Sequence, residues 1–135
     1  LQTLYVRIIE AKELCRPLLQ DLARQDMSHS NPYVKVALLP DKKNTKQTTV
    51  KKKTQDPIWN ETFGFEIPFN EAESRILEIS IKDFDKYSRH CVIGCMIFPL
   101  NEINLIKGCH MWKPLMPGNK VTNQICCGFL KRFKV

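Results

Sequence analysis

The sequence lacks the features that mark membrane-spanning, secreted and disulfide-stapled chains. No window approaches about eighteen consecutive apolar residues, the length of a spanning helix. The chain opens LQTLYVRIIE, without the basic and then apolar pattern of a secretory signal. Its six cysteines include no CxxC pair, and the adjacent Cys126 and Cys127 are a poor framework for ordinary disulfides. We therefore expect reduced thiols in a cytosolic setting, and contact with a membrane only from outside it.

Extreme composition is also absent. Hydrophobic residues make up 43% and charged residues 26% of the chain, which excludes a disordered, collagen-like or coiled-coil protein. A length of 135 residues suffices for one core but not for two domains. We expect residues 1–135 to form a single domain. Because Leu4 already belongs to a strand pattern, we also expect this domain to be excised from a longer protein.

Short runs of alternating apolar residues predict an all-β fold. The expected strands cover residues 4–9, 33–38, 47–53, 63–67, 77–81, 92–98, 111–115 and 124–130. Turn residues such as Asn31-Pro32 and Asp56-Pro57 separate these runs. The stretch from residue 15 to 31 is expected to be a long loop with a helical turn or two. Eight short strands indicate an eight-stranded antiparallel Greek-key β-sandwich.

The net charge of +7 is concentrated in residues 42–53, which we call the lysine segment. It contains no acid and six lysines: Lys42, Lys43, Lys46, Lys51, Lys52 and Lys53. Thr48 and Val50 are expected on one face of this strand, and Lys51 and Lys53 on the other. Such a strand is either a solvated edge that resists aggregation or a flat positive surface that attracts anions.

Three motifs in order carry a resemblance to a known family. They are NPYVKV at residues 31–36, LLPDKKNTKQTTVKKKTQDPIWNETFGFEIP at residues 38–68, and KDFDKYSRHCVIG at residues 82–94. Together they closely resemble a synaptotagmin-type C2 domain over residues 4–115. The resemblance implies a β-sandwich with calcium-binding loops at one end, a polybasic strand on one side and a non-enzymatic role in membrane trafficking.

The resemblance also assigns the calcium positions. Asp83 and Asp85 match the paired aspartates of the third loop, and Asp26 matches a first-loop aspartate only if one residue is deleted. Asn31 and Cys91 stand where two further aspartates are expected. Calcium requires six to eight oxygen ligands and binds more weakly as carboxylates are lost. We expect no calcium binding at physiological concentration, and the alternative is weak residual calcium-dependent binding of phospholipid. The remaining aspartates could equally serve loop backbone donors.

The lysine segment matches the family's polybasic strand better. The resemblance implies binding of anionic phospholipids, including phosphoinositides, with Met27 and Tyr87 at loop tips that dip into lipid. It places the domain in the cytoplasm, peripherally on vesicle, Golgi or plasma membrane. Acidic segments of fusion-machinery proteins, or a second C2 domain, are alternative partners for the same charge.

Other chemistries find little support. No His and Cys pair has the spacing of a structural zinc finger, and His90 beside Cys91 lacks the third group of a catalytic arrangement. Residues 42–53 contain no stacking aromatics, so we expect no nucleic-acid binding. Trp59 and Trp112 are expected in the core or under loops. The expected state is a monomer that is not an enzyme.

Overall fold

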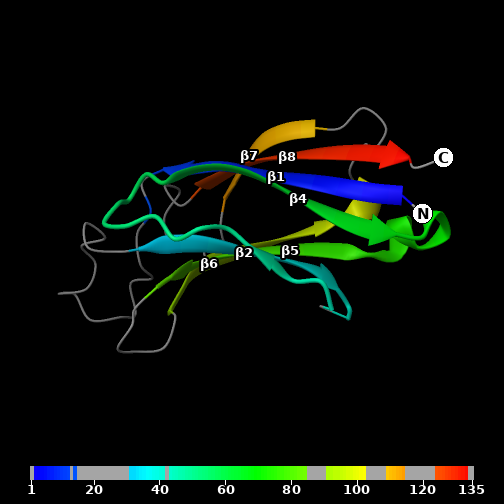
Figure 1. Cartoon of the computed structure of the whole chain (residues 1–135), viewed down its shortest axis with the longest axis horizontal. Coiled ribbons are helices and arrows are strands. Elements are labelled where there is room, and N and C mark those ends of the chain that lie inside the picture. Colours follow the sequence, from blue (N-terminus) through cyan, green and yellow to red (C-terminus); the bar gives the residue numbers. More distant parts are fainter. Residues whose placement is uncertain are drawn as a thin grey trace.

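Two four-stranded sheets packed face to face form the fold (Figure 1). The computed structural model describes residues 2–12, 14, 31–41, 43–84, 91–102, 109–114 and 124–133. The first sheet has the order β4-β1-β8-β7, with strands Ile58–Ile67, Gln2–Lys12, Gln124–Phe133 and Cys109–Pro114. The second has the order β3-β2-β5-β6, with strands Lys46–Gln47, Pro32–Leu39, Ile76–Asp83 and Cys91–Pro99. All pairings between these strands are antiparallel, which confirms the predicted sandwich.

The core consists of every second residue of the strands, as the alternation predicted. Val6 and Ile8 of β1, Val36 of β2, Phe65 of β4 and Ile79 of β5 are each at most 1% exposed. Inward side chains of β1 and β4 therefore meet those of β2 and β5 between the sheets. This burial removes apolar surface from water at both inner faces and holds the sheets together.

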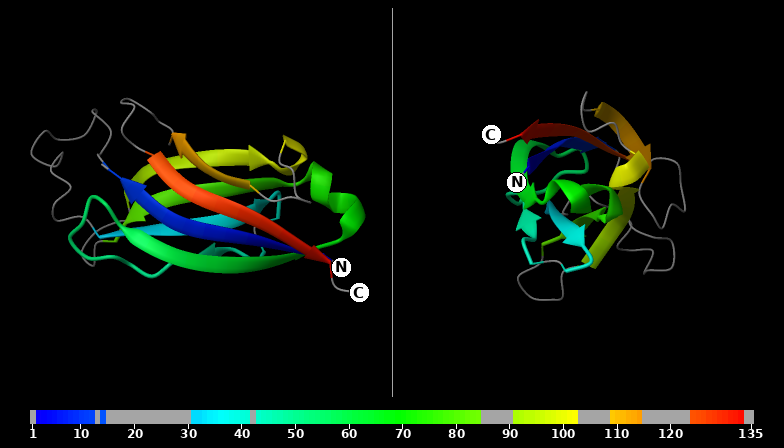
Figure 2. Two further views of the ribbon diagram at one scale, coloured as in Figure 1. Left: turned by 90° about the horizontal axis from the view of Figure 1, so that it is seen from above. Right: turned by 90° about the vertical axis from the view of Figure 1, so that its right-hand side faces the viewer.

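The end of the sandwich at which β1 begins and β8 ends is closed by short helices. The 3-10 helices η3 (Phe69–Ser74) and η4 (Leu100–Glu102) lie here, and Figure 2 shows both chain ends beside them. The Arg75 guanidinium donates to the Leu39 carbonyl at 2.8 Å and to Asp41 Oδ1 at 3.2 Å. Its side chain is only 13% exposed, so Arg75 fixes the turn after β2 against η3.

The lysine segment forms less strand than the sequence predicted. The expected strand at residues 47–53 is wrong beyond Gln47, because β3 contains only Lys46 and Gln47. The Val34 amide donates to the Thr48 hydroxyl at 2.9 Å instead of to a backbone carbonyl. The Thr48 amide still donates to the Val34 carbonyl at 2.9 Å, and the next backbone bond runs from the Lys51 amide to the Pro32 carbonyl at 3.0 Å. A side-chain hydroxyl has thus displaced a backbone acceptor, and the ladder breaks at Thr48.

The two tryptophans differ. Trp59 is 5% exposed, as expected, and its indole N–H donates to the Thr49 carbonyl at 3.0 Å. Trp112 is 40% exposed, so its expected burial is wrong. It faces outward on the edge strand β7, where the Lys12 ammonium lies 5.4 Å from the ring centroid. The packing of an edge strand cannot be read from one aromatic residue.

One prediction on chain organisation is left without a structural test. The long loop expected at residues 15–31 lies outside the described residues except for Asn31. Within the described ranges, no helix is long and apolar enough to cross a membrane.

Removing a core ring should destabilise the fold strongly. Phe65→Ala is expected to lower the free energy of unfolding by about 3–5 kcal/mol, because it leaves a cavity between the sheets. Ile58→Ala removes an apolar side chain that is 58% exposed and should cost under about 1 kcal/mol. Urea unfolding followed by tryptophan fluorescence measures both values. Equal losses for the two variants would contradict the described core.

Candidate functional site

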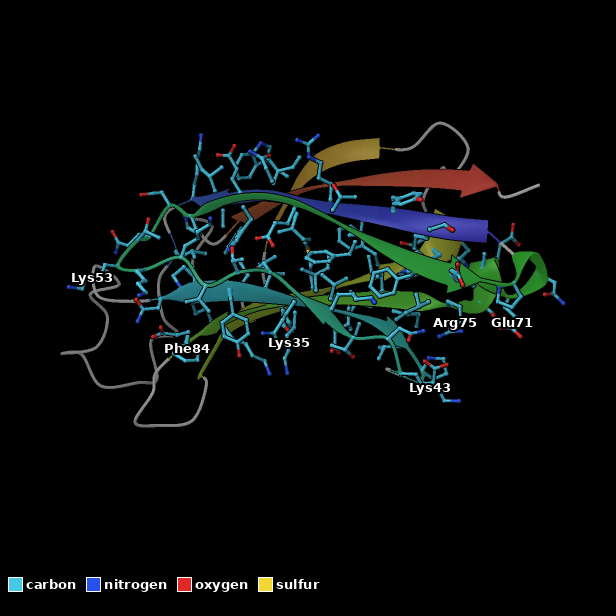
Figure 3. All side chains as sticks on the ribbon, viewed as in Figure 1. Lys35, Lys43, Lys53, Glu71, Arg75 and Phe84 are labelled. Carbon is cyan, nitrogen blue, oxygen red and sulfur yellow. The ribbon has the colours of Figure 1, made fainter. Side chains whose placement is uncertain are left out.

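The predicted calcium positions that the structure describes come together at one end of the sandwich. Asp83, the last residue of β5, pairs with Pro32 of β2 on one side and with Cys91 of β6 on the other. Asn31 immediately precedes β2. The backbone positions of Asn31, Asp83 and Cys91 are therefore neighbours, as the family resemblance implied. Lys53 and Phe84 lie at the same end of the molecule (Figure 3).

Asn31 links three segments through neutral hydrogen bonds. Its side-chain oxygen accepts from the Lys53 amide at 3.1 Å. Its side-chain amide donates to the Phe84 carbonyl at 3.1 Å, and its backbone carbonyl accepts from the Phe84 amide at 2.9 Å. The residue thus ties the start of β2 to the end of the lysine segment and to the residue after β5. Lys53 sits there with a φ of 52°, a conformation that needs such support.

Asp83 is buried at this node. It is 5% exposed, and its Oδ1 accepts from the Asn31 backbone amide at 2.8 Å. The Asn31 side-chain oxygen and Asp83 Oδ1 thus each accept a hydrogen bond from a backbone amide. Among the described residues, no three His, Cys, Asp or Glu side chains are grouped for a metal ion. Whether calcium binds also depends on Asp26 and Asp85, which lie outside the described residues, so the expected absence of calcium binding stays a prediction.

Several predicted residues cannot be placed. Asp26, Asp85, Met27 and Tyr87 lie outside the described residues, as does Lys42. Cys91 is described by its backbone pairing alone. The expected roles of these residues remain predictions.

The lysine segment is spread along one edge of its sheet. Lys43, Lys46, Lys52 and Lys53 are exposed, and Lys51 is half-buried. Lys46 pairs with Val36, whereas Lys51 bonds to Pro32, so about 13 Å of β2 separates the two ends of the segment. Figure 3 shows Lys43 and Lys53 toward opposite ends of the sandwich. Lysines that are close in sequence therefore form an extended strip instead of a compact cluster.

The middle of the strip is held rigidly. The Thr49 hydroxyl donates to Glu61 Oε2 at 2.9 Å, and the Thr49 amide donates to the same atom at 3.1 Å. The Trp59 indole bonds to the Thr49 carbonyl from the core side. These contacts from β4 fix the backbone of the lysine segment where its ladder to β2 is broken.

The structure adds two lysines that the sequence analysis did not select. Lys35 of β2 pairs with Gln47 of β3, and Lys82 of β5 pairs with Tyr33 of β2. Both lysines are half-buried on the outward face of the sheet, and Lys35 points away from the sandwich in Figure 3. The outward position of Lys35 follows from the alternation in β2, but that of Lys82 required the strand pairing. Burial raises the pKa of the Tyr33 phenol beside them.

Lys46 also borders a hollow that it shares with residues of β1 and β4. It has a volume of about 350 Å³ and is lined by Thr3, Tyr5, Asn44, Lys46, Gly64, Phe65 and Glu66. A Cβ added at Gly64 would lie 3.2 Å from Thr3 Cγ2, so the glycine helps to keep the floor of the hollow low. Lys46 and Glu66 contribute opposite charges, so the hollow offers no net attraction for an anion.

Comparison with known proteins identifies the fold and its relatives. The family model described as C2 domain matches residues 2–115. Synaptotagmin-1 of Aplysia californica is 48% identical over 96 residues, which cover 70% of this chain and 22% of that protein. Human synaptotagmin-7 is 41% identical over 116 residues, covering 85% of this chain and 27% of that protein. The chain spans about a quarter of the length of these curated relatives.

Solved structures agree on the architecture. The first C2 domain of plant extended synaptotagmin 1 superposes with a TM-score of 0.81 at 25% identity, covering 98% of this chain and 95% of that one. Human GIVD cytosolic phospholipase A2 matches with a TM-score of 0.80 at 25% identity, but only over 16% of its length. The second likeness is therefore confined to a small part of that enzyme. The C2 domain model matches most of the length of this chain, so this chain belongs to the C2 domain family, with synaptotagmins among its sequence relatives.

Proposed function

We propose that this domain is a non-enzymatic membrane-docking module that binds anionic phospholipids, including phosphoinositides, without calcium. The observation that carries the proposal is the exposed strip of lysines along the edge of the β3-β2-β5-β6 sheet. Its relatives are synaptotagmins, which supports a role in membrane trafficking. The domain would act on the cytoplasmic side of a vesicle, Golgi or plasma membrane.

Charge and shape both favour a lipid surface. Each lysine near an anionic membrane contributes ~1 kcal/mol. Residues 42–53 contain no acid of their own, and the Glu61 carboxylate of β4, bonded to Thr49, offsets only part of their charge. The strip is extended, and Lys35 and Lys82 widen it across the outward face of the sheet. An extended strip can contact several head groups of a membrane at once. A single small anion would engage only one end of it.

The neutral node at Asn31 supports independence from calcium. A carboxylate at this position would contribute a charge and a ligand, whereas the Asn31 side chain is engaged with Lys53 and Phe84. The node therefore already joins three segments through hydrogen bonds within the chain. Asp83 and the undescribed Asp26 and Asp85 would be too few carboxylates for tight binding.

The motifs QDMSHSNPYVK and SRHCVIG refine the family placement. They look most like the first C2 domain of the B/K protein, also called synaptotagmin XVII. We infer from this likeness that a second C2 domain belongs to the same full-length protein. It would be a partner for this domain, as would acidic segments of fusion-machinery proteins, which the lysine segment would also attract.

Neutralising either end of the strip should weaken binding to acidic vesicles. Lys43→Ala with Lys46→Ala, and Lys52→Ala with Lys53→Ala, should each reduce affinity about tenfold or more, because two cationic contacts are lost. Arg7→Ala with Lys12→Ala removes the same charge from exposed positions on the other sheet and should change affinity less than about threefold. Sedimentation with phosphatidylserine and phosphoinositide vesicles in a calcium chelator measures these effects.

Three outcomes would argue against lipid binding by the strip. Equal losses for all three double variants would show that only net charge matters. Unchanged binding by both lysine variants would remove the segment from the site. Pull-down of acidic fusion-machinery segments without lipid, combined with no vesicle binding, would favour the protein partner instead.

Calcium should bind the unaltered chain no more tightly than about 100 μM, well outside the sensor range. Asn31→Asp alone should change little, because the position of Cys91 still lacks a carboxylate. Asn31→Asp combined with Cys91→Asp restores both expected aspartates and should produce measurable calcium binding. Calorimetric titration compares the three proteins. Binding near 10 μM or tighter by the unaltered chain would contradict calcium independence.

A further inference from the structure

The outer edge of β6 is long and carries no charge. The strand covers Cys91–Pro99 with the sequence CVIGCMIFP. β6 is the last strand of the order β3-β2-β5-β6, so no described strand pairs with its outer side. The left view of Figure 2 shows it beside β5, in yellow. Its outward Ile97 is 58% exposed. A long, apolar, unpaired edge is a template for another strand.

The other three sheet edges are protected. β3 is only two residues long and presents the exposed Lys46. β7 contains Lys113 and ends at Pro114, which has no amide hydrogen to donate. β4 is bent by a bulge at Asn60, where φ is 50°, and its Glu61 carboxylate is bonded to Thr49 of the lysine segment. Short length, charge, proline and bulges are the usual protections of edge strands. β6 also has an irregularity at Ile93 and ends at Pro99, but unlike the other edges it carries no charge, and residues 94–98 between these two points are regular.

We propose that the β6 edge is occupied by β6 of a second copy of this chain. The two strands would run antiparallel about a two-fold axis and join two four-stranded sheets into one sheet of eight. An uncharged strand is suited to its own copy, because no like charges meet across the axis. The β6 edge of the second copy is as unprotected as that of the first, and the pairing covers both edges at once.

The register of this pairing follows from the interruptions in β6. Ile93 lies at the irregularity between β5 and β6, and Pro99 cannot donate a hydrogen bond. The regular segment between them is residues 94–98, and its centre is Met96. If Met96 pairs with Met96 of the second copy, the buried side chains of both β6 strands stay on the core-facing side of the joined sheet. It also sets the outward Cys95 of each copy opposite the outward Ile97 of the other, which covers the exposed isoleucine.

The positive charge of the chain does not oppose this arrangement at close range. β2 and β5 separate β6 from the lysine-bearing β3, so the two lysine segments would lie at the far edges of the joined sheet. The net charge of +7 on each copy still produces long-range repulsion. Association should therefore strengthen as salt screens that repulsion. The pairing does not depend on the proposed lipid binding and is tested without lipid. It would revise the expected monomer.

The first test is self-association in solution with the thiols kept reduced. Sedimentation equilibrium should show the apparent mass rising from one chain toward two between about 10 μM and 1 mM, because a single strand edge buries little surface. Ile97→Lys places a charge on the edge and should leave a monomer throughout that range. Ile58→Lys changes a residue of equal exposure, 58%, on the other sheet and should behave as the unaltered chain does.

Contrary results are equally clear. A monomer at about 1 mM in high salt would overturn the proposal, and the edge would then belong to a strand of another protein. Loss of association in Ile58→Lys as well as Ile97→Lys would place the contact elsewhere. Circular dichroism checks that each variant remains folded.

The second test reads the register. Ile97→Cys places a thiol opposite Cys95 of the second copy, where the Cβ atoms of facing residues approach to about 4.5 Å, a separation that a disulfide can span. Mild oxidation should give a covalent dimer whose linkage, mapped by mass spectrometry, joins positions 95 and 97. Ile58→Cys, treated identically, should give no such dimer beyond background. A dimer linked mainly through other cysteines would contradict the Met96-centred pairing.

Discussion

The alternation of buried and exposed residues along paired strands is the constraint on which this molecule depends. Two sheets share one core, so each strand must direct every second side chain inward, and the register of its neighbours is then fixed. The same rule decides what the outside presents. Lys35 and Ile97 face outward because Val36 and Phe98 face inward. Core packing therefore places both the cationic strip and the apolar edge.

Much of this was predictable from the sequence, because a period of two is a local signal. The strands at residues 63–67 and 77–81 were predicted from alternation alone, and the structure buries Phe65 and Ile79 within them. The break at Thr48 was not predictable, since a β-branched residue favours a strand and only the position of the Val34 amide shows that the hydroxyl replaces a carbonyl. Lys82 joined the outward face through pairing with a strand almost fifty residues away in sequence.

At the candidate site, too, the sequence predicted positions but not hydrogen-bond partners. The resemblance placed Asn31 and Asp83 together, and the register confirms that they are neighbours. The resemblance could not show which groups the side-chain oxygens of Asn31 and Asp83 contact. An asparagine can serve as a weak metal ligand or as a neutral bridge, and the choice depends on which backbone groups lie within reach. Here Lys53 and Phe84 lie within reach, so the amide makes the hydrogen bonds that connect the loops.

The two edges of the β3-β2-β5-β6 sheet illustrate how charge selects partners. At β3 the backbone edge is short and interrupted, and lysines surround it. A strand that paired here would have to remove water from these lysines, which costs free energy, whereas an anionic surface would be attracted to them. At β6 the edge is regular and uncharged, so an anion gains nothing while a strand gains hydrogen bonds and covers Ile97. Because β2 and β5 separate these edges, each can be occupied without disturbing the other. A sheet of four strands can thereby carry the proposed lipid-binding surface at one edge and the proposed strand-pairing surface at the other.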